Sequence, residues 1–306
     1  MRVDAKTPST NSPEISEIRG NRVSLKSAHI LGLASKGPIV IYPTTTVKDA
    51  CRVMVDNGIR RVPVVDPGTH KLSGIVSGRD LVSFFGGGQK YNIVKNTYGG
   101  NLFAAINLPI TKIMEENVIC VKESDSIEKA AATLLDANVG GCPVINREGE
   151  VTAIVSEMDF IRNLRHETKI KTRDIMSTDV ITVTPGMSIG DAARIMINMG
   201  KRRLPVVHNG EVVGVLRTTD ILRFISNNEF ASFGTVEANT ILKRESVGEA
   251  MNTFFLTMTP EDDIEHLIEV MIARRLGGFP VEADRKLAGI VTEHDIFKFF
   301  YSRLLY

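Results

Sequence analysis

The chain has 306 residues, of which 43% are hydrophobic and 24% are charged, a balance typical of folded globular domains. Its net charge of +1 provides no overall basic field for nucleic acid, and no apolar run approaches the ~18 residues of a membrane span. The N-terminal residues lack the apolar segment of a signal peptide. Three widely separated cysteines argue against a disulfide framework or a zinc site. We therefore predict a soluble, cytoplasmic protein with no nucleic-acid or membrane partner.

Residues 1–35 are rich in Ser, Thr, Asn and charge and show little apolar periodicity. We expect this lead-in to be partly flexible or to add a strand to a neighbouring sheet. A helix is predicted next, in a repeat that spans 36–85. Thr46 is a natural N-cap, and residues 0, 3, 4 and 7 places along the helix form one apolar face: Val47, Ala50, Cys51 and Met54.

Two strands and a second helix complete this first repeat. The first strand contains Val-Pro-Val at 62–64, and a polar turn separates it from the second strand, LSGIVS. Asp80 follows, just before the apolar helix LVSFF. Gly58, eleven residues after Val47, tolerates the left-handed conformation that commonly ends a helix.

An insertion at 86–109 begins with three glycines and contains Tyr91, Tyr98 and Phe103. We expect either a surface loop with a short helix that covers an edge, or a lid or partner-binding arm. The same order of elements then recurs at 110–166, 170–226 and 246–306, with a second linker at 227–245. The aspartates that match Asp80 are Asp159, Asp220 and Asp295. Four copies of one repeat are therefore predicted.

This strand–helix–strand–strand–Asp–helix pattern resembles the cystathionine-β-synthase (CBS) motif over about residues 36–306. A chain of four such motifs is similar to archaeal four-motif proteins and to the gamma subunit of AMP-activated protein kinase. The resemblance implies a mixed α/β (α+β) fold. It further implies that repeats one and two, and three and four, form two pseudo-two-fold pairs (Bateman modules) in a flat, disc-like chain. One repeat is too small to bury both faces of its sheet, which also favours pairing.

In the resembled family the run G-x-x-S/T-x-x-D binds the ribose of an adenine nucleotide. Repeat one matches it with Gly74, Ser77 and Asp80, and repeat four with Gly289, Thr292 and Asp295. Repeat two has Ala153 in place of the glycine but keeps Ser156 and Asp159. Repeat three keeps Gly214 and Asp220 but has Arg217 at the hydroxyl position. Repeats one and four are thus the better candidate sites, although each aspartate could equally be a simple helix cap.

Paired arginines precede the proline in the odd repeats, Arg60-Arg61 and Arg202-Arg203, where the even repeats have Gly-Gly. The resemblance implies that these arginines face ligand phosphates, which a guanidinium binds bidentately. Alternatively, they protect an exposed strand edge. Arg79 and His294 are weaker phosphate candidates, and His294 could simply be solvated. Thr45 and Ala50 could line a base pocket shared with Asp159, or serve only as turn and helix residues.

These features favour a regulatory protein that binds AMP, ADP or ATP and signals to an unidentified partner, as a monomer or homodimer. Recognition of S-adenosylmethionine or another adenosyl ligand, and a ligand-free scaffold, are the alternatives. We expect no enzyme, because the chain has no P-loop, no GxGxxG turn, and no catalytic or metal-binding set of residues. No catalytic cofactor is expected either.

Overall fold

The computed structural model describes residues 28–164, 169–227 and 241–305. Most of the predicted lead-in and most of the 227–245 linker therefore lie outside the described residues. The first repeat contains α2 (Val47–Asp56), β2 (Arg61–Val65), β3 (Leu72–Ser77) and α3 (Gly78–Val82), preceded by η1 (Ile30–Gly32) and β1 (Ser35–Lys36). The second contains η3 (Ile110–Lys112), β4 (Val121–Lys122), α6 (Ile127–Asp136), β5 (Gly141–Ile145), β6 (Val151–Ser156) and α7 (Glu157–Arg162).

Repeats three and four follow the same order. The third contains η4 (Thr172–Asp174), α8 (Ile189–Asn198), β7 (Arg203–His208), β8 (Glu211–Arg217) and α9 (Thr218–Asn227). After α11 (Ile241–Arg244), the fourth contains α12 (Val247–Ala250), α13 (Ile264–Arg274), β9 (Gly278–Ala283), β10 (Lys286–Thr292) and α14 (Glu293–Leu305). The repeat boundaries expected from the sequence remain predictions.

The apolar stripes predicted for the first helix of each repeat are confirmed. In α2 the buried residues are Val47, Ala50, Cys51 and Met54, and the matching residues of α6, α8 and α13 are buried as well. Thr46, Ser126 and Ser188 accept a hydrogen bond from the third residue of their helices, as N-caps do. Asp263 makes no such bond and instead forms an ion pair with Lys171.

Each repeat gives the segment before its first helix to the sheet of its sequence neighbour. The paired positions are Ser35 with Ile154, Glu115 with Ile75, Ser177 with Ile290, and Asn252 with Val215. Because the exchange is reciprocal, neither repeat of a pair completes its own backbone hydrogen bonding. The predicted pairing of repeats one with two and three with four is therefore confirmed.

Helix packing joins repeats of different pairs. One apolar core unites repeats one and three, where α2 and α3 pack on α9. The other unites repeats two and four, where α14 packs on α6 and α7. In this second core the rings of Phe160, Phe297 and Tyr301 are in contact, and the Tyr301 hydroxyl donates to the Phe160 carbonyl over 3.3 Å.

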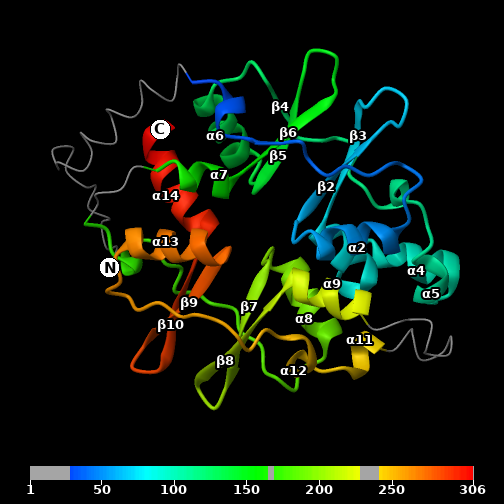
Figure 1. Ribbon diagram of the computed structural model, residues 1–306. Helices are drawn as coiled ribbons and strands as arrows, with labels where there is room; N and C mark the ends of the chain where they lie inside the picture. The colour runs from blue at the N-terminus through cyan, green and yellow to red at the C-terminus, as the bar shows by residue number, and fades with distance from the viewer. Residues whose placement is uncertain (1–27, 165–168, 228–240, 306) are drawn as a thin grey trace, which may run out of the picture.

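Figure 1 shows the resulting disc-like ring, in which the repeats follow one another in the order one, two, four, three and the strand turns lie at the periphery. Strand exchange thus builds the pairs, and helix packing joins the two pairs into one body.

The 86–109 insertion contributes to the core. It contains α4 (Tyr91–Tyr98) and α5 (Leu102–Ala105) and follows the π-type turn η2 (Ser83–Gly87). Val94, Ala105 and Ile106 are buried in the core shared by repeats one and three. The Leu108 carbonyl accepts a hydrogen bond from the Val47 amide at the start of α2. The insertion is therefore part of the apolar core and is not only a surface loop.

Candidate functional site

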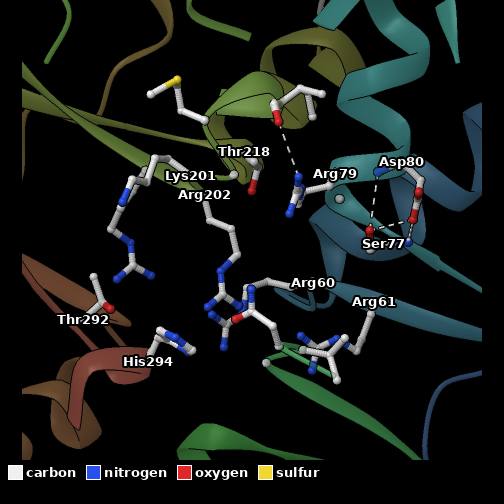
Figure 2. Close-up of a pocket in the computed structure, with 18 of the residues that line it drawn as sticks. Arg60, Arg61, Ser77, Arg79, Asp80, Lys201, Arg202, Thr218, Thr292 and His294 are labelled. Atoms are coloured by element: carbon white, nitrogen blue, oxygen red, sulfur yellow. Dashed lines mark hydrogen bonds between the residues drawn. The ribbon is translucent and has the colours of Figure 1, made fainter. Parts of the chain in front are cut away.

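A cavity of about 760 Å³ lies where the four repeats meet. Repeats one and four each contribute their acidic residue and its hydroxyl neighbour, Ser77 with Asp80 and Thr292 with Asp295. Five arginines, two lysines and a histidine also line it: Arg60, Arg61, Arg79, Arg202, Arg203, Lys90, Lys201 and His294. Figure 2 shows Arg60 and Arg202 between Ser77 and Asp80 on one side and Thr292 and His294 on the other.

In Asp80 and Asp295 one carboxylate oxygen caps the helix, and the other oxygen takes no part in the cap. Asp80 Oδ2 accepts from the Ser77 amide at 2.8 Å and from the Ser77 hydroxyl at 2.6 Å. Asp295 Oδ2 makes the same two bonds to Thr292 at the same distances. The cap and the ribose-binding interpretations are therefore compatible, because capping leaves Oδ1 of each aspartate as a further acceptor.

The strand exchange places an apolar pair from the neighbouring repeat in the cavity wall near each of these aspartates. Repeat two supplies Val118 and Ile119, whose segment pairs with β3, and repeat three supplies Val180 and Ile181, whose segment pairs with β10. We name the two sites cleft one (Ser77, Asp80, Val118, Ile119) and cleft four (Thr292, Asp295, Val180, Ile181). Sequence reasoning missed the apolar pairs because they come from another repeat.

Asp159 and Asp220 do not line this cavity. Asp159 accepts from the Ser35 hydroxyl at 3.2 Å and forms an ion pair with Arg162 at 3.6 Å. Asp220 is held by Arg217, which donates from Nε to Oδ2 at 2.8 Å and from Nη2 to Oδ1 at 2.7 Å. The arginine that breaks the motif in repeat three therefore occupies both oxygens of its aspartate.

Arg60 and Arg202 reach across the ring to two glutamates that the sequence analysis did not single out. Arg60 pairs bidentately with Glu293, with 3.0 Å between Nη2 and Oε2, and Arg202 pairs with Glu157 at 3.3 Å. Both glutamates are 1% exposed, whereas the arginines are 32% and 27% exposed toward the cavity. The signal was present, since a glutamate follows the hydroxyl residue only in the even repeats.

The pKa shifts at this centre reflect burial and the neighbouring charges. Burial alone would raise the pKa of Glu293, but the charges of Arg60, Arg202 and Arg203 outweigh it and hold that pKa at about 2. Glu293 in turn raises the pKa of Arg60. Four arginines face two buried glutamates, which leaves an excess of positive charge beside the cavity.

The Gly-Gly pairs of the even repeats provide space for the guanidinium groups of Arg61 and Arg203. A Cβ at Gly141 would collide with the Arg61 guanidinium, and one at Gly278 would collide with that of Arg203. Both glycines have positive φ, 150° and 155°, a backbone conformation that other residues rarely adopt. Burial lowers the pKa of Arg61 and of Arg203 to about 10. The even repeats thus leave room for the cations of the odd ones.

The other predicted phosphate residues lie at the cavity but already have partners. Arg79 donates to the Ile197 carbonyl at 3.4 Å (Figure 2). His294 Nδ1 lies 2.6 Å from a carboxylate oxygen of Glu157. His294 is thus more than a solvated side chain.

Four of the predicted residues have further contacts in the structure. A Cβ at Gly74 would lie 2.6 Å from the Met114 sulfur, and one at Gly289 would lie 2.8 Å from that of Met176. These glycines therefore leave room for a methionine of the paired repeat. Ala50 is buried in the core, and the Thr45 hydroxyl accepts a hydrogen bond from the Tyr42 amide. The ribose and base roles of these four residues remain predictions.

Within the described ranges no group of three His, Cys, Asp or Glu side chains is arranged to hold a metal ion. No helix of the described part of the chain combines the length and the apolar character needed to cross a membrane.

Fold and site together define a class of protein in which four α/β repeats form two strand-exchanged pairs around a cationic central cavity. The family model for the CBS domain matches residues 30–87, 110–166, 173–227 and 247–302, and the chain therefore belongs to the CBS domain family.

Similar proteins occur in archaea. The chain is 37% identical to the uncharacterized protein MJ1225 of Methanocaldococcus jannaschii. The alignment spans 272 residues and covers 87% of this chain and 96% of that protein. The crystal structure of MJ1225, described as a candidate archaeal homolog of γ-AMPK, matches with a TM-score of 0.83 and 36% identity over 89% of this chain and 100% of the other. A 33.4 kDa protein from a ribosomal RNA operon of Thermofilum pendens is 28% identical over 269 residues, 85% of this chain and 87% of the relative.

Proposed function

We propose that the chain binds the adenine nucleotides AMP, ADP or ATP in clefts one and four and signals their binding to a partner protein. The observation that carries this proposal is that Asp80 and Asp295 share one cavity with Arg60 and Arg202. A carboxylate is a suitable acceptor for ribose hydroxyls, and guanidinium groups are suitable donors to phosphate oxygens. The candidate γ-AMPK homolog MJ1225, which the chain resembles over nearly its whole length, supports the same ligand class.

Charge favours a phosphorylated ligand over a neutral nucleoside. The arginines of the cavity exceed the two buried glutamates in number, so an anionic phosphate would balance charge that a nucleoside would leave in place. The apolar pairs of the two clefts, Val118 with Ile119 and Val180 with Ile181, offer a surface for the flat base. S-adenosylmethionine would use the ribose acceptor and the apolar pair but would bring no phosphate to the arginines.

A regulatory output follows from the shape of the site. Cleft four lies at the junction of repeats three and four, and Glu293 at its edge pairs with Arg60 of repeat one. A ligand phosphate that attracts Arg60 would change this contact between the two modules. A nucleotide can alter a partner only if it binds two states of the ring with different affinity, and this contact is where the two states would differ.

Calorimetric titration of the ligand-free chain with AMP, ADP, ATP, adenosine and S-adenosylmethionine tests the proposal. We expect micromolar binding of the phosphorylated ligands and much weaker binding of adenosine. Asp80→Ala and Asp295→Ala should each weaken binding, whereas Asp220→Ala, whose carboxylate is already held by Arg217, should change it little. Equal affinity of all three variants would contradict the site assignment, and tighter S-adenosylmethionine than AMP would contradict the ligand class.

A further inference from the structure

Cleft one contains a cation from its own chain at the position where a ligand would bind. Lys90, which lies between η2 and α4, donates from its ammonium group to Asp80 Oδ1 and to the Ile113 carbonyl. The Lys90 and Asp80 side chains are 28% and 22% exposed, and both line the cavity. Asp80 Oδ1 is the acceptor that the helix cap leaves over, so the lysine occupies the ribose position of cleft one.

Cleft four differs at this point. Asp295 Oδ1 accepts only a long bond of 3.3 Å from the Ser177 hydroxyl, and among the described residues no lysine or arginine forms an ion pair with Asp295. The two clefts therefore share their carboxylate and apolar pair but differ in whether a cation competes for the carboxylate.

Packing on repeat three holds Lys90 in this position. The Ser83 hydroxyl accepts from the Lys90 amide at 3.2 Å, and the Gly88 amide donates to the Ser83 carbonyl at 3.2 Å. A Cβ at Gly88 would lie 2.7 Å from Ile197 of α8, so the glycine lets this turn approach repeat three closely. The backbone of Lys90 is thus fixed, and only its side chain is free to move within the cavity.

We propose that Lys90 is the residue that makes cleft one discriminate between nucleotides and nucleosides. This inference rests on the proposed function. A ribose that binds Asp80 Oδ1 displaces the ammonium group from its carboxylate. A nucleotide offers the displaced ammonium a phosphate in the same cavity, whereas adenosine offers no anion and leaves it without a counter-charge. Adenosine is therefore penalised at cleft one more than AMP is.

The test compares adenosine and AMP by calorimetry in the Asp295→Ala background, which leaves cleft one as the site under observation. Lys90→Met removes the charge and keeps much of the side-chain length, and Lys95→Met, an exposed lysine of α4 outside the cavity, is the matched control. We expect K90M to bind adenosine about fivefold more tightly, the value of a partly exposed ion pair, and to bind AMP no more tightly than before. K95M should leave both affinities unchanged.

Lys90→Arg provides a variant that retains the charge and should retain the preference of the parent for AMP. An unchanged ratio of AMP to adenosine affinity in K90M would overturn the inference, as would an equal loss of both. If D295A binds neither ligand while the parent binds AMP, cleft one is no site and the inference fails, although the proposed function survives through cleft four. If the parent binds no adenine ligand, the proposed function itself fails.

Discussion

At one position in the last strand of each repeat, the size of the residue depends on a side chain of the paired repeat. A Cβ at Gly74, Gly214 or Gly289 would lie 2.6–2.8 Å from a methionine sulfur of the paired repeat. The second repeat has Ala153 at this position, and by strand register the residue that replaces the methionine there is Ala34. The larger residue on one side is thus compensated by the smaller one on the other, which explains the departure of Ala153 from the motif.

Gly289→Ala should therefore destabilise the chain by about 2 kcal/mol, because the new methyl group must displace the Met176 sulfur and the Ser177 carbonyl. The pair G289A with Met176→Ala reproduces the Ala–Ala combination of repeat two. We expect urea unfolding to show that the double variant is more stable than the sum of the two single changes predicts. Strict additivity would mean that the two residues do not contact each other.

The sequence predicted those site residues whose role depends on their own repeat, such as the capping hydroxyls and aspartates. It did not single out Lys90 or the buried glutamates Glu157 and Glu293, because only their contacts in the fold, or a comparison between repeats, distinguish them. Lys90 was one of two lysines in the insertion, and taken alone Glu157 resembled any acidic residue at the start of a helix. The Gly-Gly and Arg-Arg alternation was readable, but its reason, the space that Arg61 needs, became visible only in the structure.

At the scale of elements, the ends of the four first helices share one left-handed residue. Gly58, Asn138 and Gly200 have φ between 50° and 66°, and Arg275 after α13 has φ 52°. Arg275 stands where the other three repeats have glycine or asparagine, yet it adopts the same left-handed conformation. An arginine in this conformation is unfavourable relative to glycine, because its Cβ approaches the backbone.

Arg275→Gly should raise the free energy of unfolding by about 1 kcal/mol, since glycine adopts the left-handed conformation without that steric cost. Arg274→Gly removes the same charge one residue earlier, inside α13, and should instead lower stability by about 1 kcal/mol. Thermal or urea unfolding of the two variants gives the comparison. A loss of stability in R275G would show that the arginine makes a contact worth more than the strain.

At the scale of the whole molecule, the resemblance to the CBS motif predicted which repeats form pairs but not which repeats share an apolar core. The apolar faces of the second helices indicated that these helices are buried. They did not indicate which repeat each helix packs against, because an apolar face can pack on any other apolar surface. The structure shows that α14 packs on repeat two and α9 on repeat one, and that Arg60 and Arg202 link the modules across the centre. Ion pairs between the modules should therefore contribute to the stability of the ring as a whole.

The low pKa of Glu293 makes this contribution dependent on pH. Because its pKa in the folded chain, about 2, lies below the ordinary value for a glutamate, the stabilisation is complete above about pH 5 and is lost as the pH falls toward 2. The difference in unfolding free energy between the parent and Glu293→Gln should shrink by about 3 kcal/mol over that range. Glu261→Gln, at an exposed glutamate, is the control. A difference that stays constant with pH would contradict the account.

The proposed function requires that nucleotides bind in cleft one and cleft four, which both contribute residues to the shared cavity. The most direct test is the binding stoichiometry of ATP, measured by calorimetry, in two double variants of the chain. D159A/D220A should retain two ATP sites, because neither aspartate lines the cavity, whereas D80A/D295A should lose both. Loss of binding in D159A/D220A with retention in D80A/D295A would contradict the account.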